Sequence, residues 1–125
     1  MLNNYLIIAI GGAAGAVTRY LIGTFALNRL GFHFPYGTLF ANLIGCFIIG
    51  VFMTFFTERI VMNPAWKLLI TIGFLGSLTT FSSFSYESIK LLLSGQYLFG
   101  FLNISANMIL GFGATLLGII IARLV

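Results

Sequence analysis

The sequence contains few of the residues that carry most enzyme chemistry. Its 125 residues include one cysteine, one histidine and two acidic residues, and both acidic residues are glutamate. Acid–base and metal-assisted catalysis depend on carboxylate, imidazole or thiolate groups brought together. A lone cysteine, Cys46, cannot form a disulfide within the chain. We therefore expect neither an enzyme nor a structural zinc or redox site.

Charge is scarce as well. Charged residues make up 6% of the chain, whereas a soluble domain carries about 25%. The six basic residues stand singly from Arg19 to Arg123 and are not gathered into the patch that nucleic acids require. The sequence therefore predicts no nucleic-acid partner, and it predicts lipid as the main surrounding solvent.

Long apolar stretches fill the rest of the chain, which is 60% hydrophobic. A membrane-spanning helix needs about 20 apolar residues, so the chain has room for four spans. We predict an all-α integral membrane protein, a single transmembrane domain over residues 1–125, with spans at approximately 5–30, 35–57, 65–93 and 97–124. No basic segment precedes the first stretch, so we interpret it as a mature helix and not a cleaved signal peptide.

The basic residues at or near the ends of the spans are distributed almost evenly between the two sides of the membrane. One side has Arg59, Lys67 and Arg123, and the other has Arg29 and Lys90. Because lysine and arginine in short loops set orientation, this chain has little preferred orientation. We predict dual topology and an antiparallel homodimer about a twofold axis in the membrane plane. The alternative is one orientation, selected by a feature that the charge count misses.

Two spans carry polar or small residues at intervals of three or four, which places them on one helical face. These residues are Thr38, Asn42 and Gly45 in the second span and Asn103, Asn107 and Gly111 in the fourth. Polar groups inside a membrane usually face a partner, a cavity or a pathway. The alternative interpretation is that the asparagines only hold helices together.

The third span places glycine and hydroxyl residues at membrane depth, over residues 73–85. Broken helices are tolerated in membranes where the freed carbonyls line a cavity or bind an ion. We predict a break near Gly76 and Thr79, whose carbonyls in two copies of the chain would bind a small cation such as sodium. Alternatively, the hydroxyls bond to carbonyls one turn earlier and the helix only bends.

Phe81 and Phe84 share a helical face with Thr80 and Ser83 nearby. The edge of a phenyl ring is positive, so ring edges can stabilise an anion without binding it as tightly as arginine would. Conduction needs such sites, which bind the anion weakly enough for it to leave again. The alternative is that the two rings are ordinary core packing.

Two charged residues lie farther from the ends of the predicted spans than the others. Arg19 lines an entrance that attracts anions, or extends to the interface, or bonds backbone carbonyls at helix ends. Glu87 either partners hydroxyls or a cation, or lies at the interface beside Lys90.

Three segments together resemble the Fluc (CrcB) family of small dual-topology fluoride channels. The resemblance spans nearly the whole chain. The segments are residues 11–20 with the sequence GGAAGAVTRY, residues 35–39 with the sequence PYGTL followed by Asn42 and Gly45, and residues 73–87.

This resemblance implies an antiparallel homodimer with two fluoride pores and a structural sodium ion at its centre. It implies that Gly76 and Thr79 bind sodium through backbone carbonyls, that Phe81 and Phe84 are pore phenylalanines, and that Asn42 donates to fluoride. Asn103 and Asn107 occupy a polar track on the fourth helix. The implied function is passive export of cytoplasmic fluoride, and hence fluoride resistance, across the inner membrane of a bacterium.

Two other functions remain as alternatives. A proton-coupled small multidrug exporter also uses four short spans in a dual-topology dimer, but it depends on a carboxylate inside the membrane. Here the first span carries Arg19, and Glu87 is the candidate coupling acid. The second alternative is a noncatalytic assembly subunit whose polar faces only pack against other membrane proteins.

Overall fold

The structure is a computed structural model that describes residues 2–58 and 63–125, and these residues form an all-helical bundle. Four helices are long and apolar enough to cross a membrane: Asn3–Leu30, Tyr36–Glu58, Pro64–Leu93 and Tyr97–Leu124. These bounds agree with the predicted spans to within two residues at each end. The chain is therefore a multi-pass membrane protein, as its composition predicts.

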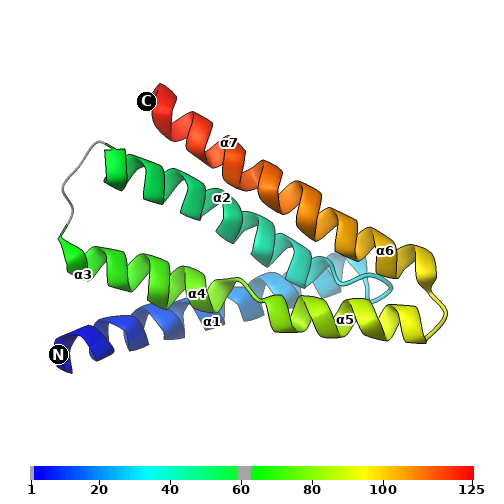
Figure 1. The fold of residues 1–125 in the computed structure, drawn as a ribbon. Helices are drawn as coiled ribbons and strands as arrows, with labels where there is room; N and C mark the ends of the chain where they lie inside the picture. Colours follow the sequence, from blue (N-terminus) through cyan, green and yellow to red (C-terminus); the bar gives the residue numbers. More distant parts are fainter. Residues whose placement is uncertain (1, 59–62) are drawn as a thin grey trace.

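The first two spans are uninterrupted α-helices, whereas the last two are built of shorter segments. The elements are α1 (Leu2–Leu30), α2 (Tyr36–Glu58), α3 (Pro64–Lys67), the π-helical η1 (Leu68–Leu75), α4 (Gly76–Leu78), α5 (Phe81–Leu93), α6 (Tyr97–Ser105), the π-helical η2 (Ala106–Leu110) and α7 (Gly111–Leu124). Figure 1 shows both chain termini at one end of the bundle. Arg59, used in the charge count, lies outside the described residues.

Local sequence signals explain where the helices begin and end. The Asn63 side chain accepts a hydrogen bond from the Ala65 amide, 2.9 Å away, and Pro64 occupies the first helical position of α3. Gly31 and Gly95 have φ values of 80° and 79°, and they end α1 and α5 in the left-handed conformation that glycine adopts at little cost. These turns are short, so consecutive spans run side by side.

Glycine contacts bring the spans close together. A Cβ atom on Gly15 in α1 would overlap the carbonyl of Phe74 in η1, and one on Gly118 in α7 would overlap the carbonyl of Phe47 in α2. Close backbone packing of this kind supplies van der Waals contact where lipid removes the hydrophobic drive between helices. α1 therefore packs on the first half of the third span, and α2 packs along α7.

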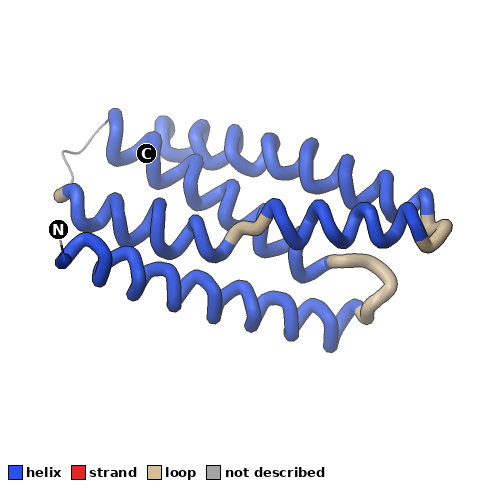
Figure 2. The backbone as a smooth tube through the Cα atoms, turned by 60° about the horizontal axis from the view of Figure 1, so that its bottom comes forward, coloured by secondary structure: helices blue, strands red, loops and turns tan. Residues whose placement is uncertain are grey.

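The third span changes direction at Thr79 and Thr80. Their backbone dihedrals are extended, with ψ values of 154° and 116°, between the end of α4 and the start of α5. Figure 2 shows this junction as a short loop segment in the middle of the bundle. Beyond it, α5 lies against α6 and no longer follows the line of α4 (Figure 1).

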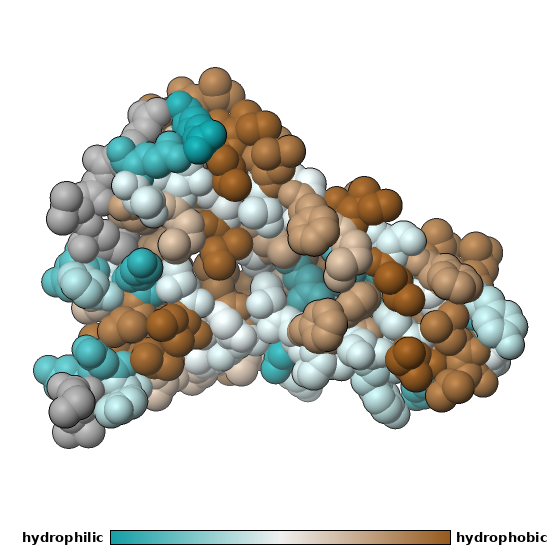
Figure 3. Space-filling view, in the orientation of Figure 1, coloured by the Kyte–Doolittle hydropathy of each residue, from teal (hydrophilic) through white to brown (hydrophobic). Residues whose placement is uncertain are grey.

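The outer surface suits lipid. Brown and pale residues cover most of the face in Figure 3, and only 11% of the most apolar window of the first span is buried inside the molecule. Large apolar side chains such as Ile10, Val17 and Phe25 are more than half exposed. A surface this apolar would be an aggregation hazard in water and is stable in a bilayer.

Candidate functional site

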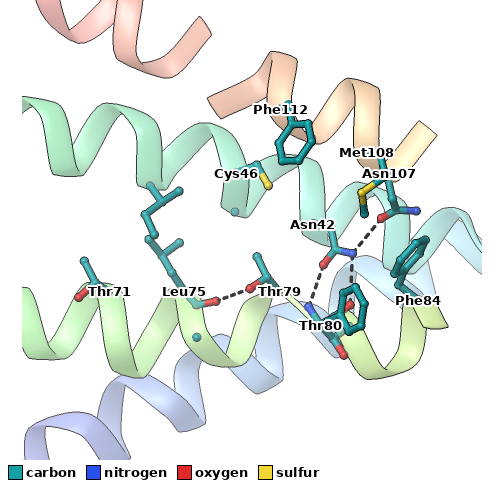
Figure 4. A pocket seen from close by; sticks show the side chains of 15 residues that line it. Asn42, Cys46, Thr71, Leu75, Thr79, Thr80, Phe84, Asn107, Met108 and Phe112 are labelled. Atoms are coloured by element: carbon teal, nitrogen blue, oxygen red, sulfur yellow. Dashed lines mark hydrogen bonds between the residues drawn. The ribbon is translucent and has the colours of Figure 1, made fainter. Parts of the chain in front are cut away.

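A cavity of about 380 Å³ lies beside the α4–α5 junction, between α2, the third span and the fourth span. Figure 4 shows side chains from these three spans facing it. Its polar or aromatic lining residues are Asn42, Thr71, Thr79, Thr80, Phe81, Phe84, Asn107 and Phe112. Among residues 2–58 and 63–125, no charged residue lines the cavity, so these residues offer it only neutral donors, acceptors and rings.

Asn42 holds the junction in its extended form. Its Oδ1 accepts a hydrogen bond from the Thr80 amide at 2.8 Å, and its Nδ2 donates to the Thr80 carbonyl at 3.3 Å. The Asn42 side chain thus pairs with the backbone as a neighbouring strand would (Figure 4). Its Nδ2 also donates to Asn107 Oδ1 at 2.9 Å. One side chain therefore joins α2, the junction and η2.

Backbone carbonyls at the junction, among them those of Gly76 and Thr79, lose the partners that a continuous helix would provide. In an α-helix the Gly76 carbonyl would accept from the Thr80 amide, but that amide donates to Asn42. The Thr79 carbonyl would accept from the Ser83 amide, but that amide donates to Thr80 Oγ1 at 3.2 Å. Gly76 and Thr79, which the sequence predicts as cation ligands, are thus among the residues whose carbonyls lack the helical partner, and their role as ligands stays a prediction.

The two phenylalanines have opposite surroundings. Phe84 is 6% exposed, whereas Phe81 is 73% exposed and stands on the outside of the subunit. Their ring centroids lie 5.5 Å apart with an interplanar angle of 60°, so the edge of one ring approaches the other ring. Both rings line the cavity. Phe84 is therefore part of the packed core of the bundle, whereas Phe81 is not.

The predicted polar stripe of the fourth span divides into two parts. Asn107 lines the cavity, and its Nδ2 donates to the carbonyl and to Oδ1 of Asn103, each at 3.0 Å. Asn103 is fully buried and is absent from the cavity wall. Its Nδ2 donates to Ser88 Oγ at 2.9 Å. The sequence reasoning missed Ser88, although its position four residues after Phe84 is a signal that could have identified it.

A second hollow of about 570 Å³ opens at the end of the bundle away from the termini, and it contains Thr38, Glu87 and Lys90. Thr38 Oγ1 donates to Glu87 Oε1 at 2.8 Å. The other carboxylate oxygen of Glu87 is buried and has no hydrogen-bond partner among the described residues. Glu87 therefore partners a hydroxyl, which is one of the two interpretations of its position, and it lies outside the central cavity.

The remaining predicted residues are close to these hollows or away from them. Ser83 is half-buried, and its Oγ accepts from Thr80 Oγ1 at 3.2 Å. Arg19 is half-buried on α1 and lines neither hollow. Within residues 2–58 and 63–125, Arg19 makes no hydrogen bond, so the bonds to carbonyls considered for it are not observed there.

The oxygen atoms at the junction suit a hard monovalent cation. The described part of the chain has no group of three histidine, cysteine or acidic residues of the kind that binds zinc. Carbonyl oxygens freed from a helix are the ligands that sodium takes in broken membrane helices. The donor set at Gly76 and Thr79 therefore fits sodium.

Comparison with known proteins gives a consistent result. Residues 6–119 match the model of a family described as CrcB-like protein, Camphor Resistance (CrcB). A protein of Sulfurihydrogenibium sp. (strain YO3AOP1) is 42% identical over 123 residues, which cover 98% of this chain and 99% of that protein. One from Solibacter usitatus (strain Ellin6076) is 44% identical over 119 residues, 95% of this chain and 98% of its own length.

A third relative, from Dehalococcoides mccartyi (strain CBDB1), is 46% identical over 110 residues, 88% of this chain and 85% of its own length. All three relatives are named fluoride-specific ion channel FluC. The matches extend across all four spans, including the α4–α5 junction and both asparagine-bearing helices. The chain therefore belongs to the CrcB-like family.

Proposed function

We propose that this protein is a fluoride channel, not an enzyme, that passively exports cytoplasmic fluoride across the plasma membrane of a bacterium. The observation that carries the proposal is its 42% identity, over 98% of its length, to a protein named as such a channel. The central cavity supports it, because an anion there meets amide donors and ring edges and no carboxylate. The same cavity disfavours the multidrug exporter, which needs an acid at the substrate site.

The chemistry of the cavity suits brief binding of a small anion. Fluoride leaving water requires several donors, and Asn42 and Thr80 carry amide and hydroxyl groups on the cavity wall. Ser83, which accepts from Thr80 Oγ1, carries a further hydroxyl next to that wall. The edges of Phe81 and Phe84 add positive electrostatic potential without a fixed charge. Sites of this kind are favourable enough to enter and weak enough to leave. Thr38 and Glu87 lie at the mouth of the route, in the hollow at the bundle end.

Asn42 must exchange partners when fluoride arrives. Its two Nδ2 hydrogens are directed at the Thr80 carbonyl and at Asn107 Oδ1. An anion that accepts from Nδ2 therefore replaces one of these oxygens. Because each replaced bond contributes only about 1 kcal/mol, the exchange costs little. The proposed route thus uses donors that are already oriented before the ion enters.

The proposed assembly is an antiparallel dual-topology homodimer with two pores and the broken third helix at its axis. The central cavity is open and has Asn42, Thr80 and Asn107 on its wall, and polar groups such as these are unfavourable where they meet lipid. A second copy would cover the cavity together with Phe81, which is 73% exposed beside it. Lys67 and Arg123 lie toward one end of the bundle and Arg29 and Lys90 toward the other, so the described charges give no orientation bias.

Sodium is the proposed structural ion between the two subunits. Each subunit would contribute the carbonyl oxygens of Gly76 and Thr79, whose helical partners are engaged elsewhere. The ion would neutralise the partial negative charge of the clustered carbonyls at the centre of the dimer. The proposed role of the sodium ion is structural. Asn42 contributes indirectly, because its Oδ1 accepts the hydrogen bond of the Thr80 amide, which in a continuous helix would donate to the Gly76 carbonyl.

The first prediction tests the channel itself. Purified protein in liposomes loaded with fluoride or chloride should release fluoride within seconds and retain chloride, as followed with ion-selective electrodes. Liposomes without protein are the control. If the protein releases fluoride no faster than these controls, the channel proposal is wrong. Release of an organic cation driven by a proton gradient would favour the exporter.

The second prediction concerns orientation. With Cys46→Ser as background, a cysteine placed at exposed Ser94 should react with an impermeant maleimide from both sides of the membrane, about half from each. Crosslinking of such subunits should yield dimers containing both orientations. Complete labelling from one side alone would refute dual topology.

The third prediction concerns sodium. Exchange of sodium for a large organic cation during purification should weaken the dimer, because the facing carbonyls of Gly76 and Thr79 would then repel one another. Dimer mass by light scattering and fluoride efflux should both fall, and both should recover when sodium is returned. A dimer and an efflux rate that are insensitive to every monovalent cation would argue against the ion.

A further inference from the structure

A chain of side-chain hydrogen bonds begins at the α4–α5 junction and crosses two neighbouring spans. The Thr80 amide donates to Asn42 Oδ1, and Asn42 Nδ2 donates to Asn107 Oδ1. Asn107 Nδ2 then donates to Asn103 Oδ1 and to the Asn103 carbonyl. Each step runs from donor to acceptor in the same direction, from the third span through α2 to the fourth span.

The chain then returns to α5. Asn103 Nδ2 donates to Ser88 Oγ at 2.9 Å, and Ser88 Oγ donates to the Phe84 carbonyl at 2.8 Å. The series therefore starts at the backbone of Thr80 and ends at the backbone of Phe84, one helical turn later. It forms a closed loop around the turn that carries both phenylalanines.

Backbone groups determine the direction of the loop. An asparagine amide can be rotated so that its donor and acceptor exchange places. The Thr80 amide can only donate, so Oδ1 of Asn42 must face it, and the Asn103 carbonyl can only accept, so Nδ2 of Asn107 must face it. Between these two points every amide has one satisfied orientation. As a result, Nδ2 of Asn42 is directed toward Asn107 on the cavity wall.

Two members of the loop cannot touch an ion in the cavity. Asn103 is 0% exposed and Ser88 is 3% exposed, and neither lines the cavity that Asn42 and Asn107 share. A buried polar network of this kind orients its members strongly when it is fully satisfied, and is costly when one partner is missing.

We propose that Asn103 and Ser88 are positioning residues for the fluoride route: they act through Asn107 and the Phe84 carbonyl and do not contact the ion. This inference rests on the proposed function. Asn103 accepts from Asn107 Nδ2 through Oδ1, and this bond helps to keep Asn107 Oδ1 turned toward Asn42. Asn42 Nδ2 is thereby held at the cavity wall by an acceptor that fluoride replaces when it enters. Ser88 connects Asn103 to the turn of α5 that bears Phe84.

The test compares two changes at one position. Asn103→Leu removes both the donor and the acceptor, and it should lower fluoride efflux from liposomes by about tenfold. Asn103→Asp retains an acceptor, and when protonated it also retains a hydroxyl donor toward Ser88. N103D should therefore come nearer to the parent rate at the acidic end of a pH series, where the carboxyl is protonated, than at the alkaline end, where it is ionised and has no donor for Ser88. The parent and protein-free liposomes are measured at each pH.

The outcomes separate this inference from the proposed function. A parent protein that releases no fluoride would overturn the function, whereas an active parent with an equally active N103L would overturn the positioning role alone. Equal low rates for N103D and N103L at every pH would also contradict it. N103L and N103D are checked for an unchanged elution volume, which shows that the fold and assembly persist, before the comparison.

A variant at a second position tests the proposal independently, in case the Asn103 variants do not fold. Ser88→Ala leaves Asn103 Nδ2 without its acceptor and should lower efflux several-fold, by the same argument. Ser85→Ala, on the exposed side of α5, is the matched control and should keep the parent rate. A parent-like rate for S88A would contradict the proposal. In the double variant S88A/N103L the two effects should be less than additive, because both changes open one loop.

Discussion

Replacing Asn42 with leucine should abolish fluoride efflux, lowering the rate by about a hundredfold or more. The change removes the amide donor at the cavity, and it also leaves the Thr80 amide without its acceptor at the centre of the membrane. An unpaired buried amide costs about 1–3 kcal/mol, so the α4–α5 junction should rearrange toward a continuous helix. That rearrangement would return the Thr80 amide to the Gly76 carbonyl.

The measurement is the initial rate of fluoride release from liposomes, together with the melting temperature in detergent. Asn28→Leu makes the same chemical change on the exposed end of α1 and should leave both values unchanged. An N42L rate within twofold of the parent would show that Asn42 is neither a donor to the ion nor needed for the junction.

Replacing Phe81 or Phe84 with isoleucine should lower efflux by about tenfold in each case. Isoleucine is apolar but has no positive ring edge, so the anion loses the favourable electrostatic potential that the edge of the phenyl ring supplies. The two variants should differ in stability. Phe84 is 6% exposed and its loss leaves a gap in the subunit, whereas Phe81 is 73% exposed.

Efflux rates and melting temperatures of the two variants are therefore compared with those of Phe101→Ile, an exposed phenylalanine on α6 that should be silent in both measurements. F84I should lower the melting temperature of the isolated subunit, and F81I should not. Parent-like efflux in both variants would refute a role for ring edges in conduction.

Much of the fold could be predicted because bilayer thickness constrains it. A span needs enough apolar residues to cross the hydrocarbon, so the four spans and their approximate ends were evident from hydropathy. Helical spacing also placed Thr38, Asn42 and Gly45 on one face, and the structure directs all three toward the segment that contains Thr79, Thr80 and Glu87.

Spacing could not determine how deeply each residue on a face is buried. Asn103 and Asn107 are four residues apart and share a helical face, yet only Asn107 lines the cavity. Asn103 is fully buried, and its side chain contacts Asn107 and Ser88 of α5. The depth depends on how the fourth span is rotated and on where η2 widens it, which are properties of packing against α2 and α5. Ser88 was missed for the same reason, since its partner comes from another span.

The sequence by itself determined that this chain is a membrane protein with four spans, and that its third span contains neutral polar groups and glycines. Apolar length and composition decide these properties, because each span must satisfy its own backbone hydrogen bonds in lipid. Only the tertiary structure decided which carbonyls become free and which amides face the cavity. The Gly76 and Thr79 oxygens are released because Asn42, from a different helix, and Thr80 Oγ1 take the amides that would have bonded to them.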